Sequence, residues 1–116
     1  MTIIKIGGGE SLNIHAIISD LANLEDEFLI VHGANALRDE VAKKLDYEKQ
    51  VLVSASGYSS VFSDEEALDI MMMSYSGLRN KRIVEMCQQV GINAVGLTGV
   101  DGKMIEGKRN KGIRVK

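Results

Sequence analysis

Short apolar runs that end at glycine loops, each followed by a helical pattern, constrain the fold of this chain more than any other feature. Residues 2–6 (TIIKI) run into Gly7–Gly9, and residues 27–31 (EFLIV) run into the loop 32–35. Between them, residues 11–23 carry apolar side chains at helical spacing. Strands that alternate with helices indicate an α/β fold, here a parallel (mixed) sheet with helices on both faces.

The alternation continues towards the C-terminus. We expect helices over 35–45 and 64–90, strands over 50–53 and 92–99, a loop over 54–60, and two short strands around a basic loop after residue 100. The expected N-caps are Ser11, Asn35, and a capping box of Ser63 and Glu66, with Gly91 ending the long helix. The 116 residues, 45% of them hydrophobic, suit one globular unit.

Three loops, 7–10, 32–35 and 54–60, each follow an expected strand. In a parallel sheet the carboxyl ends of the strands meet at one edge, and ligands bind there. We therefore expect these three loops to line a common binding edge.

Lys5 and the glycines 7–9 are the first candidate site at that edge. Glycines let backbone N–H groups approach an anion, and the expected helix 11–23 would point its positive end at the same place. A lysine adds a point charge for phosphoryl oxygens. The pattern is neither a Walker P-loop nor GxGxxG, so a tight turn with a solvated lysine is the alternative.

The second candidate loop is 32–35 (HGAN). We interpret His32 as a structural histidine bonded within the turn, and the amides of 33–35 as the better binders of an anion or carboxylate. His15 lies on another expected helix and no His/Cys cluster exists, so we predict no metal site. Cys87 is a single cysteine, interpreted as buried packing, and it favours a reducing compartment.

Charge and hydropathy bear on nucleic-acid binding, membrane insertion and cellular location. The net charge of −2 and the pI of about 5.7 give no basic field for nucleic acid. The apolar runs are too short to span a bilayer, and no signal-peptide pattern opens the chain. We expect a cytoplasmic protein.

Five segments, in order and over the whole chain, carry a family resemblance: IIKIGGG, LIVHGAN, GYSSVFSDEEALDI, NKRIVEMCQQVGINAVGLTGVDG and EGKRNKGIRV. They resemble the amino-acid kinase superfamily, its acetylglutamate kinase branch, and most closely the kinases acting on 2-aminoadipate or glutamate attached to an amino-group carrier protein. The resemblance implies the amino-acid kinase fold. It also implies ATP-dependent phosphorylation of a side-chain carboxylate in lysine or arginine biosynthesis.

The resemblance assigns roles residue by residue. Lys5 matches the lysine that stabilises the transferring phosphoryl group, and Gly7 and Gly8, with Gly9 beside them, match the ATP-binding glycines. Gly33, Ala34, Asn35 and Val61 stand at positions that contact the amino-acid substrate.

Two of those substrate positions depart from the family pattern. The family has HGGG where this chain has HGAN, and an arginine where this chain has Val61. Losing a bidentate arginine–carboxylate pair removes much binding and orientation. Either this chain reads a different substrate or recognition is rebuilt, with Asn35, Tyr58, Ser59 and Ser60 as candidates.

Family members continue well beyond this length, with a C-terminal half that holds the nucleotide. We therefore expect residues 1–116 to form the N-terminal, substrate-side lobe without the nucleotide lobe, inactive alone, with ATP and Mg²⁺ bound mainly through the other half. A catalytically silent binding or assembly module that kept the fold is the alternative.

Two segments suggest partners. In the expected helix 64–90, residues 71–73 (MMM) sweep about 200° of circumference, so the helix is either enclosed in its own domain or part of a subunit interface. The resemblance implies a homodimer through this helix. The basic segment 103–116 is either a solvated face or a docking surface for an acidic carrier protein, with RNA a weaker option.

Overall fold

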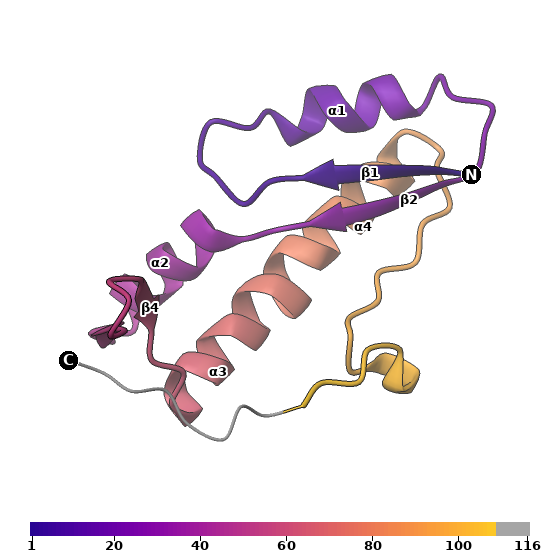
Figure 1. Ribbon diagram of the computed structural model, residues 1–116. Helices are drawn as coiled ribbons and strands as arrows, with labels where there is room; N and C mark the ends of the chain where they lie inside the picture. The colour runs from indigo at the N-terminus through magenta and orange to yellow at the C-terminus, as the bar shows by residue number, and fades with distance from the viewer. Residues whose placement is uncertain (109–116) are drawn as a thin grey trace.

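The computed structural model describes residues 1–108 (Figure 1). Its elements are β1 (Thr2–Ile6), α1 (Ile14–Leu21), β2 (Phe28–His32), α2 (Asn35–Lys44), β3 (Val51–Val53), β4 (Ser59–Val61), α3 (Glu65–Met71), the π-helix η1 (Met72–Arg79), α4 (Asn80–Gln89) and the 3₁₀ turn η2 (Asp101–Lys103). The segments α3, η1 and α4 follow one another without a break and form one long helical rod.

The strands β1 and β2 pair in parallel, with Thr2 opposite Phe28 and Ile6 opposite His32. The connection between them is the helix α1. A parallel pair joined through a helix confirms the α/β class that the alternation predicts.

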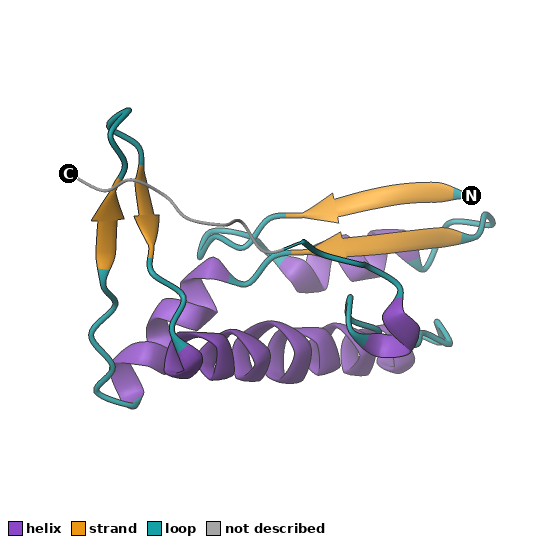
Figure 2. Ribbon diagram, turned by 60° about the horizontal axis from the view of Figure 1, so that its bottom comes forward, coloured by secondary structure: helices purple, strands orange, loops and turns teal. Residues whose placement is uncertain are grey.

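One face of this pair carries the core. The buried cluster comprises Ile6, Ile14, Ile18, Leu21, Ile83 and Cys87, with Ile4, Phe28 and Ile30 packed against it. Its members come from β1, α1 and α4, so both helices cover the same face, as Figure 2 shows. The full burial of Cys87 confirms its packing role, and this burial raises the pKa of the thiol.

The opposite face of the pair is open. Ile3, Leu29 and Val31 point there and keep 66%, 50% and 48% of their surface exposed. Side chains alternate along a strand, which explains why Ile4 and Ile6 are covered while their neighbour Ile3 is not. Helices on both faces were expected; within residues 1–108 they cover one face only.

The hairpin β3–β4 is a separate sheet. Its strands pair antiparallel, Val51 opposite Val61, around a turn in which Gly57 has a φ of +87°. The prediction of a loop over 54–60 is therefore wrong for residues 59 and 60. The prediction that this loop shares the edge of the parallel sheet is also wrong, because β3 pairs with its sequence neighbour instead of with β1 or β2.

The helix starts differ from the expected caps. The side chain of Asn13, not Ser11, caps α1 by accepting from the Ala16 amide at 3.1 Å. Asp64, not the Ser63–Glu66 box, caps α3 by accepting from the Ala67 amide at 2.8 Å. The Tyr47 hydroxyl holds the Asp64 carboxylate in place from 3.1 Å, a contact that local sequence does not reveal.

The other helix ends give one correction and one confirmation. Asn35 is the first residue of α2 and does not cap it, because its side chain accepts from the Tyr75 hydroxyl. Gly91, with a φ of +82°, follows the long rod and confirms the predicted stop.

The predicted strand over 92–99 is wrong. The segment runs alongside α4, whose side chains take its carbonyls: Asn80 donates to Leu97, Lys81 to Gly96 and Gln88 to Ala94 at 3.2–3.3 Å. These bonds occupy groups that a neighbouring strand would otherwise bind.

Beyond residue 100 the chain turns. Asp101 accepts from the Thr98 amide and hydroxyl at 2.6 and 2.9 Å and closes a tight turn at η2. The first short strand expected there is absent from residues 101–108, and the second, with most of the basic segment, lies outside the described residues. Over residues 1–108 no helix is both long and apolar enough to cross a membrane.

Candidate functional site

The loops after β1 and β2 lie in direct contact at the carboxyl end of the strand pair. The Gly33 amide donates to the Ile6 carbonyl and the Ala36 amide to the Gly8 carbonyl, both at 2.9 Å. A Cβ on Gly8 would lie 2.5 Å from the Asn35 nitrogen and 2.7 Å from the Ala34 nitrogen. Only glycine allows this approach, so the predicted common edge is confirmed for the loops 7–10 and 32–35.

The other two glycines of the first loop differ in their surroundings. A Cβ on Gly7 would meet the Leu12 side chain at 3.3 Å, whereas a Cβ on Gly9 would meet nothing within 4 Å. Gly8 is therefore the structural contact, and Gly9 borders open space where a ligand can approach. Backbone at such a glycine turn, beside the first turn of α2, suits an anion.

Lys5 stands just before this edge. It lies opposite Val31 in the ladder, between the core residues Ile4 and Ile6, so its side chain belongs to the open face of the sheet. Its side chain is exposed, and within residues 1–108 no carboxylate pairs with it. A cation without an acidic partner beside an amide-rich loop is suited to phosphoryl oxygens.

The substrate-side positions are divided between two places. Gly33, Ala34 and Asn35 lie at the glycine-loop edge, while Val61 lies on the hairpin. Ala34 is fully buried, backbone and methyl group alike, so it supports the edge from behind. Asn35 is tied to Tyr75 of η1, a residue that the sequence analysis missed. A π-helical segment often marks a functional position, but its register is not visible in sequence.

A polar cluster lies behind the second loop. His32 Nε2 is 3.4 Å from Asn80 Nδ2. Burial lowers the pKa of His32, a backbone hydrogen bond with Gly33 opposes this, and the Arg79 charge lowers it further. The imidazole is therefore neutral near pH 7, which fits the structural interpretation. The atoms His32 Nδ1, Arg79 Nε and Asn80 Oδ1 are buried without a protein partner within residues 1–108.

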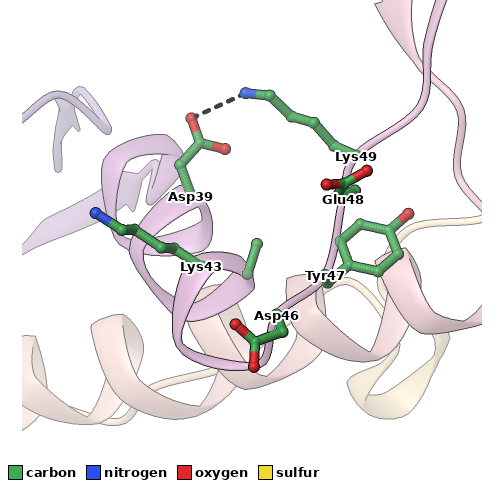
Figure 3. Close-up of a pocket in the computed structure, with 7 residues that line it drawn as sticks. Asp39, Lys43, Asp46, Tyr47, Glu48 and Lys49 are labelled. Atoms are coloured by element: carbon green, nitrogen blue, oxygen red, sulfur yellow. Dashed lines mark hydrogen bonds and ion pairs between the residues drawn. The ribbon is translucent and has the colours of Figure 1, made fainter.

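Two cavities flank α2, away from the glycine loops. Figure 3 shows the larger one, about 380 Å³, lined by Asp39, Ala42, Lys43, Asp46, Tyr47, Glu48 and Lys49. None of these residues is a predicted site residue. The second cavity, about 250 Å³, lies between α2, α3 and the hairpin and includes Val61 in its lining. We call it the α2–α3 cavity.

Within residues 1–108 no three His, Cys, Asp or Glu side chains converge to hold a metal ion. Mg²⁺ in kinases is usually held by one or two carboxylates together with the phosphates of the nucleotide.

Two glycine loops in contact at the end of a parallel α/β pair, with a lysine beside them, are suited to an anion. The model of the amino acid kinase family matches residues 1–116, and this chain belongs to that family.

The names of individual relatives are more specific than the name of the family. The chain is 38% identical over 117 residues to a protein named [LysW]-aminoadipate kinase from Deinococcus radiodurans, covering 98% of this chain and 40% of the relative. It is 38% identical to a protein of the same name from Thermus thermophilus, covering 98% of this chain and 44% of the relative. A [LysW]-aminoadipate/[LysW]-glutamate kinase from Saccharolobus islandicus is 35% identical, covering 99% and 44%. The chain thus spans less than half the length of these relatives.

Proposed function

We propose that this chain provides the phosphoryl-contacting loops and the acceptor side of a kinase that phosphorylates the side-chain carboxylate of 2-aminoadipate or glutamate. The observation that carries the proposal is the contact between Gly8 and the Gly33–Asn35 loop at the carboxyl edge of β1 and β2. Relatives named as aminoadipate or glutamate kinases, matching over nearly the whole chain, support it.

The proposal gives each of these groups a role. We assign the anion contacts to the amides of Gly7–Gly9 and of Asn35, since the Ala36 amide is already bonded to the Gly8 carbonyl. Lys5 neutralises charge that develops on the transferring phosphoryl group, which is what phosphoryl transfer needs most from a protein. ATP, when bound, supplies that phosphoryl group. The adenine, the ribose and Mg²⁺ are assigned to parts of the protein other than residues 1–108.

The acceptor is the finer part of the proposal. The names of the relatives include [LysW], and we assign to this chain an acceptor whose amino group is held by such a carrier protein, with a free acetylated amino acid as the alternative. Gly33 and Asn35 contact the acceptor through their backbone, because the Asn35 side chain is bonded to Tyr75, and the buried Ala34 holds the loop in place between them.

Two surfaces are assigned to partners. Leu68, Met72 and Met73 are exposed on the long helical rod, and we assign them to a homodimer interface. A charged residue there, as in Met72→Glu, would shift the protein from dimer to monomer in sedimentation, whereas Lys44→Glu on α2 would not. The basic segment 103–116 is assigned to docking of an acidic carrier, with binding that weakens as salt rises.

A second candidate, a binding or assembly module without kinase activity, is favoured by one observation. The family arginine is replaced by Val61, and Val61 has no charge with which to orient a carboxylate.

One assay separates the two candidates. The protein as its gene encodes it is incubated with ATP, Mg²⁺ and carrier-linked 2-aminoadipate or glutamate, and the acyl phosphate is trapped with hydroxylamine. The kinase proposal expects trapped product, lowered about 100-fold or more in kcat by Lys5→Ala and unchanged by Lys44→Ala. No product from any carboxylate acceptor, including the acetylated amino acids, would leave the binding module.

A further inference from the structure

The α2–α3 cavity brings the uncharged position 61 together with an arginine from another element. Its lining includes Val61 from β4, Arg38 and Asp39 from α2, Lys49 from the segment before β3, and Ile70 from α3. Val61, where the family resemblance implies an arginine, and Arg38 therefore border the same space of about 250 Å³.

The charges in this cavity favour an anion. Two cations, Arg38 and Lys49, face one carboxylate, Asp39. Asp39 Oδ1 accepts from Arg38 Nε and Nη2 at 3.1 and 2.9 Å, and Oδ2 accepts from Lys49 Nζ at 3.5 Å. The larger neighbouring cavity, where Figure 3 shows the Asp39–Lys49 pair, has the opposite balance, since Asp39, Asp46 and Glu48 face only two lysines.

Arg38 is the better placed of the two cations. Its side chain is 24% exposed and that of Lys49 is 47% exposed, so water screens Arg38 less. A guanidinium has five N–H donors, and Asp39 engages two of them. The remaining donors suit a carboxylate, and the pair with Asp39 holds the guanidinium plane in a fixed direction.

Most of the remaining lining is apolar. Ala42, Ala67, Ile70 and Met71 line the cavity with Val61, Ile70 is almost completely buried, and Tyr47 and Ser63 add two hydroxyl groups. A cation at an apolar cavity suits a carboxylate attached to a short aliphatic chain.

Arg38 stands on the helix that follows the second glycine loop. Its amide donates to the Ala34 carbonyl at 2.8 Å, so its backbone lies one helical turn, a rise of about 5.4 Å, after that loop. The cavity and the Gly33–Asn35 loop are thus joined through α2.

We propose that Arg38 binds the carboxylate of the acceptor that is not phosphorylated, and that it replaces from α2 the arginine absent at position 61. The inference rests on the proposed function and makes a short aliphatic dicarboxylate the substrate class. Lys49 pairs with Asp39 at 3.5 Å and is the second cation in the lining. The side chains of Tyr58, Ser59 and Ser60 are not required.

The test uses the protein as its gene encodes it and compares Arg38→Gln with the matched control Lys44→Gln, an exposed lysine on the same helix. Arg38→Gln should raise KM for the amino-acid acceptor about 10- to 100-fold and leave KM for ATP unchanged. The acceptor KM of Arg38→Lys should lie between those of Arg38→Gln and Lys44→Gln. Lysine keeps the positive charge but lacks the paired N–H donors of the guanidinium. An unchanged acceptor KM in Arg38→Gln would overturn the inference and leave the kinase proposal standing.

Rescue provides the sharper readout. In the Arg38→Gln background, Val61→Arg puts a guanidinium back at the same cavity from the other side and should restore acceptor KM to within a few-fold. A merely structural role for Arg38 would not be rescued from a different strand, so failure of rescue in a folded double variant contradicts the inference.

A binding measurement separates this inference from the proposed function. Calorimetry with glutarate, and with pentanoate, which has the same carbon count but one carboxylate, needs no turnover. Glutarate binding that exceeds pentanoate binding and is lost in Arg38→Gln supports the role of Arg38 even if no acceptor is phosphorylated. Equal binding of the two acids, or glutarate binding that survives Arg38→Gln, overturns it.

Discussion

The glycine-loop edge and the α2–α3 cavity border the same helix, yet they are built in different ways. At the edge, backbone packs on backbone: Gly8 lies against the nitrogens of Ala34 and Asn35, and Gly33 bonds to Ile6. At the cavity, side chains from α2, α3 and the hairpin meet, with Arg38, Asp39 and Lys49 in one ionic group. The glycine-loop edge depends on positions that have no side chain. The α2–α3 cavity depends on which charged groups the surrounding side chains bring to it.

This difference decides how freely each site can change. Adding any Cβ at Gly8 collides with backbone, so the loop cannot change alone. A carboxylate-binding cation, in contrast, can reach one cavity from several elements, and replacing it costs the fold little.

The strongest way to break the comparison is Gly8→Ala. Its Cβ would lie 2.5 Å from the Asn35 nitrogen, a backbone atom that cannot move aside cheaply. We expect a loss of about 2–4 kcal/mol of unfolding free energy, of the size seen for overpacked positions. Denaturant unfolding measures it.

Gly9→Ala is the matched control. It adds the same methyl group one residue further on, where nothing lies within 4 Å, and should change stability by less than about 1 kcal/mol. Equal losses at Gly8 and Gly9 would show that the loops do not pack as described.

On the cavity side, the cap of the long helical rod gives a smaller effect. Asp64→Ala removes the acceptor of the Ala67 amide and the partner of the Tyr47 hydroxyl, and should cost about 1–2 kcal/mol. Ser63→Ala should be close to neutral, because Ser63 does not cap α3. The thermal midpoints of the two variants show which residue caps α3. A larger loss for Ser63→Ala would support the Ser63–Glu66 capping box that the sequence predicted.

The smallest expected effect is the pH dependence contributed by His32. Its pKa is lowered in the folded protein, mainly by burial, so below the ordinary value of 6.5 the unfolded chain binds a proton that the folded one resists. Stability from this group is therefore full above pH 6.5 and is lost as the pH falls below it. Unfolding of His32→Gln should show a shallower decline between pH 7.5 and 5.5 than the parent. An identical slope for His32→Gln would mean that His32 protonates freely in the fold.

The sequence predicted those features that depend on short-range pattern. The strand 2–6, the parallel pairing, the contact of two glycine loops and the stop at Gly91 follow from apolar runs and glycine positions. The two glycine loops could be predicted without knowing which side chains contact one another in the folded protein.

The features that were missed depend on long-range contacts. Asn35 was expected to cap α2, but its side chain accepts a hydrogen bond from the hydroxyl of Tyr75, 40 residues away in the sequence. The strand over 92–99 reads as β by composition, but α4 binds its carbonyls through Asn80 and Lys81. Arg38 carried no signal in the sequence, because only the fold places it beside Val61.

The central claim is that the loops Gly7–Gly9 and Gly33–Asn35 form the phosphate-binding edge, and amide NMR during titration with a non-hydrolysable ATP analogue tests it most directly. The account predicts that the largest saturable shifts occur at the amides of Gly8, Gly9 and Asn35, and that Lys5→Ala weakens the binding without moving these signals in the free protein. Saturable shifts confined to the hairpin or the α2–α3 cavity, with the glycine-loop amides unchanged, would contradict it.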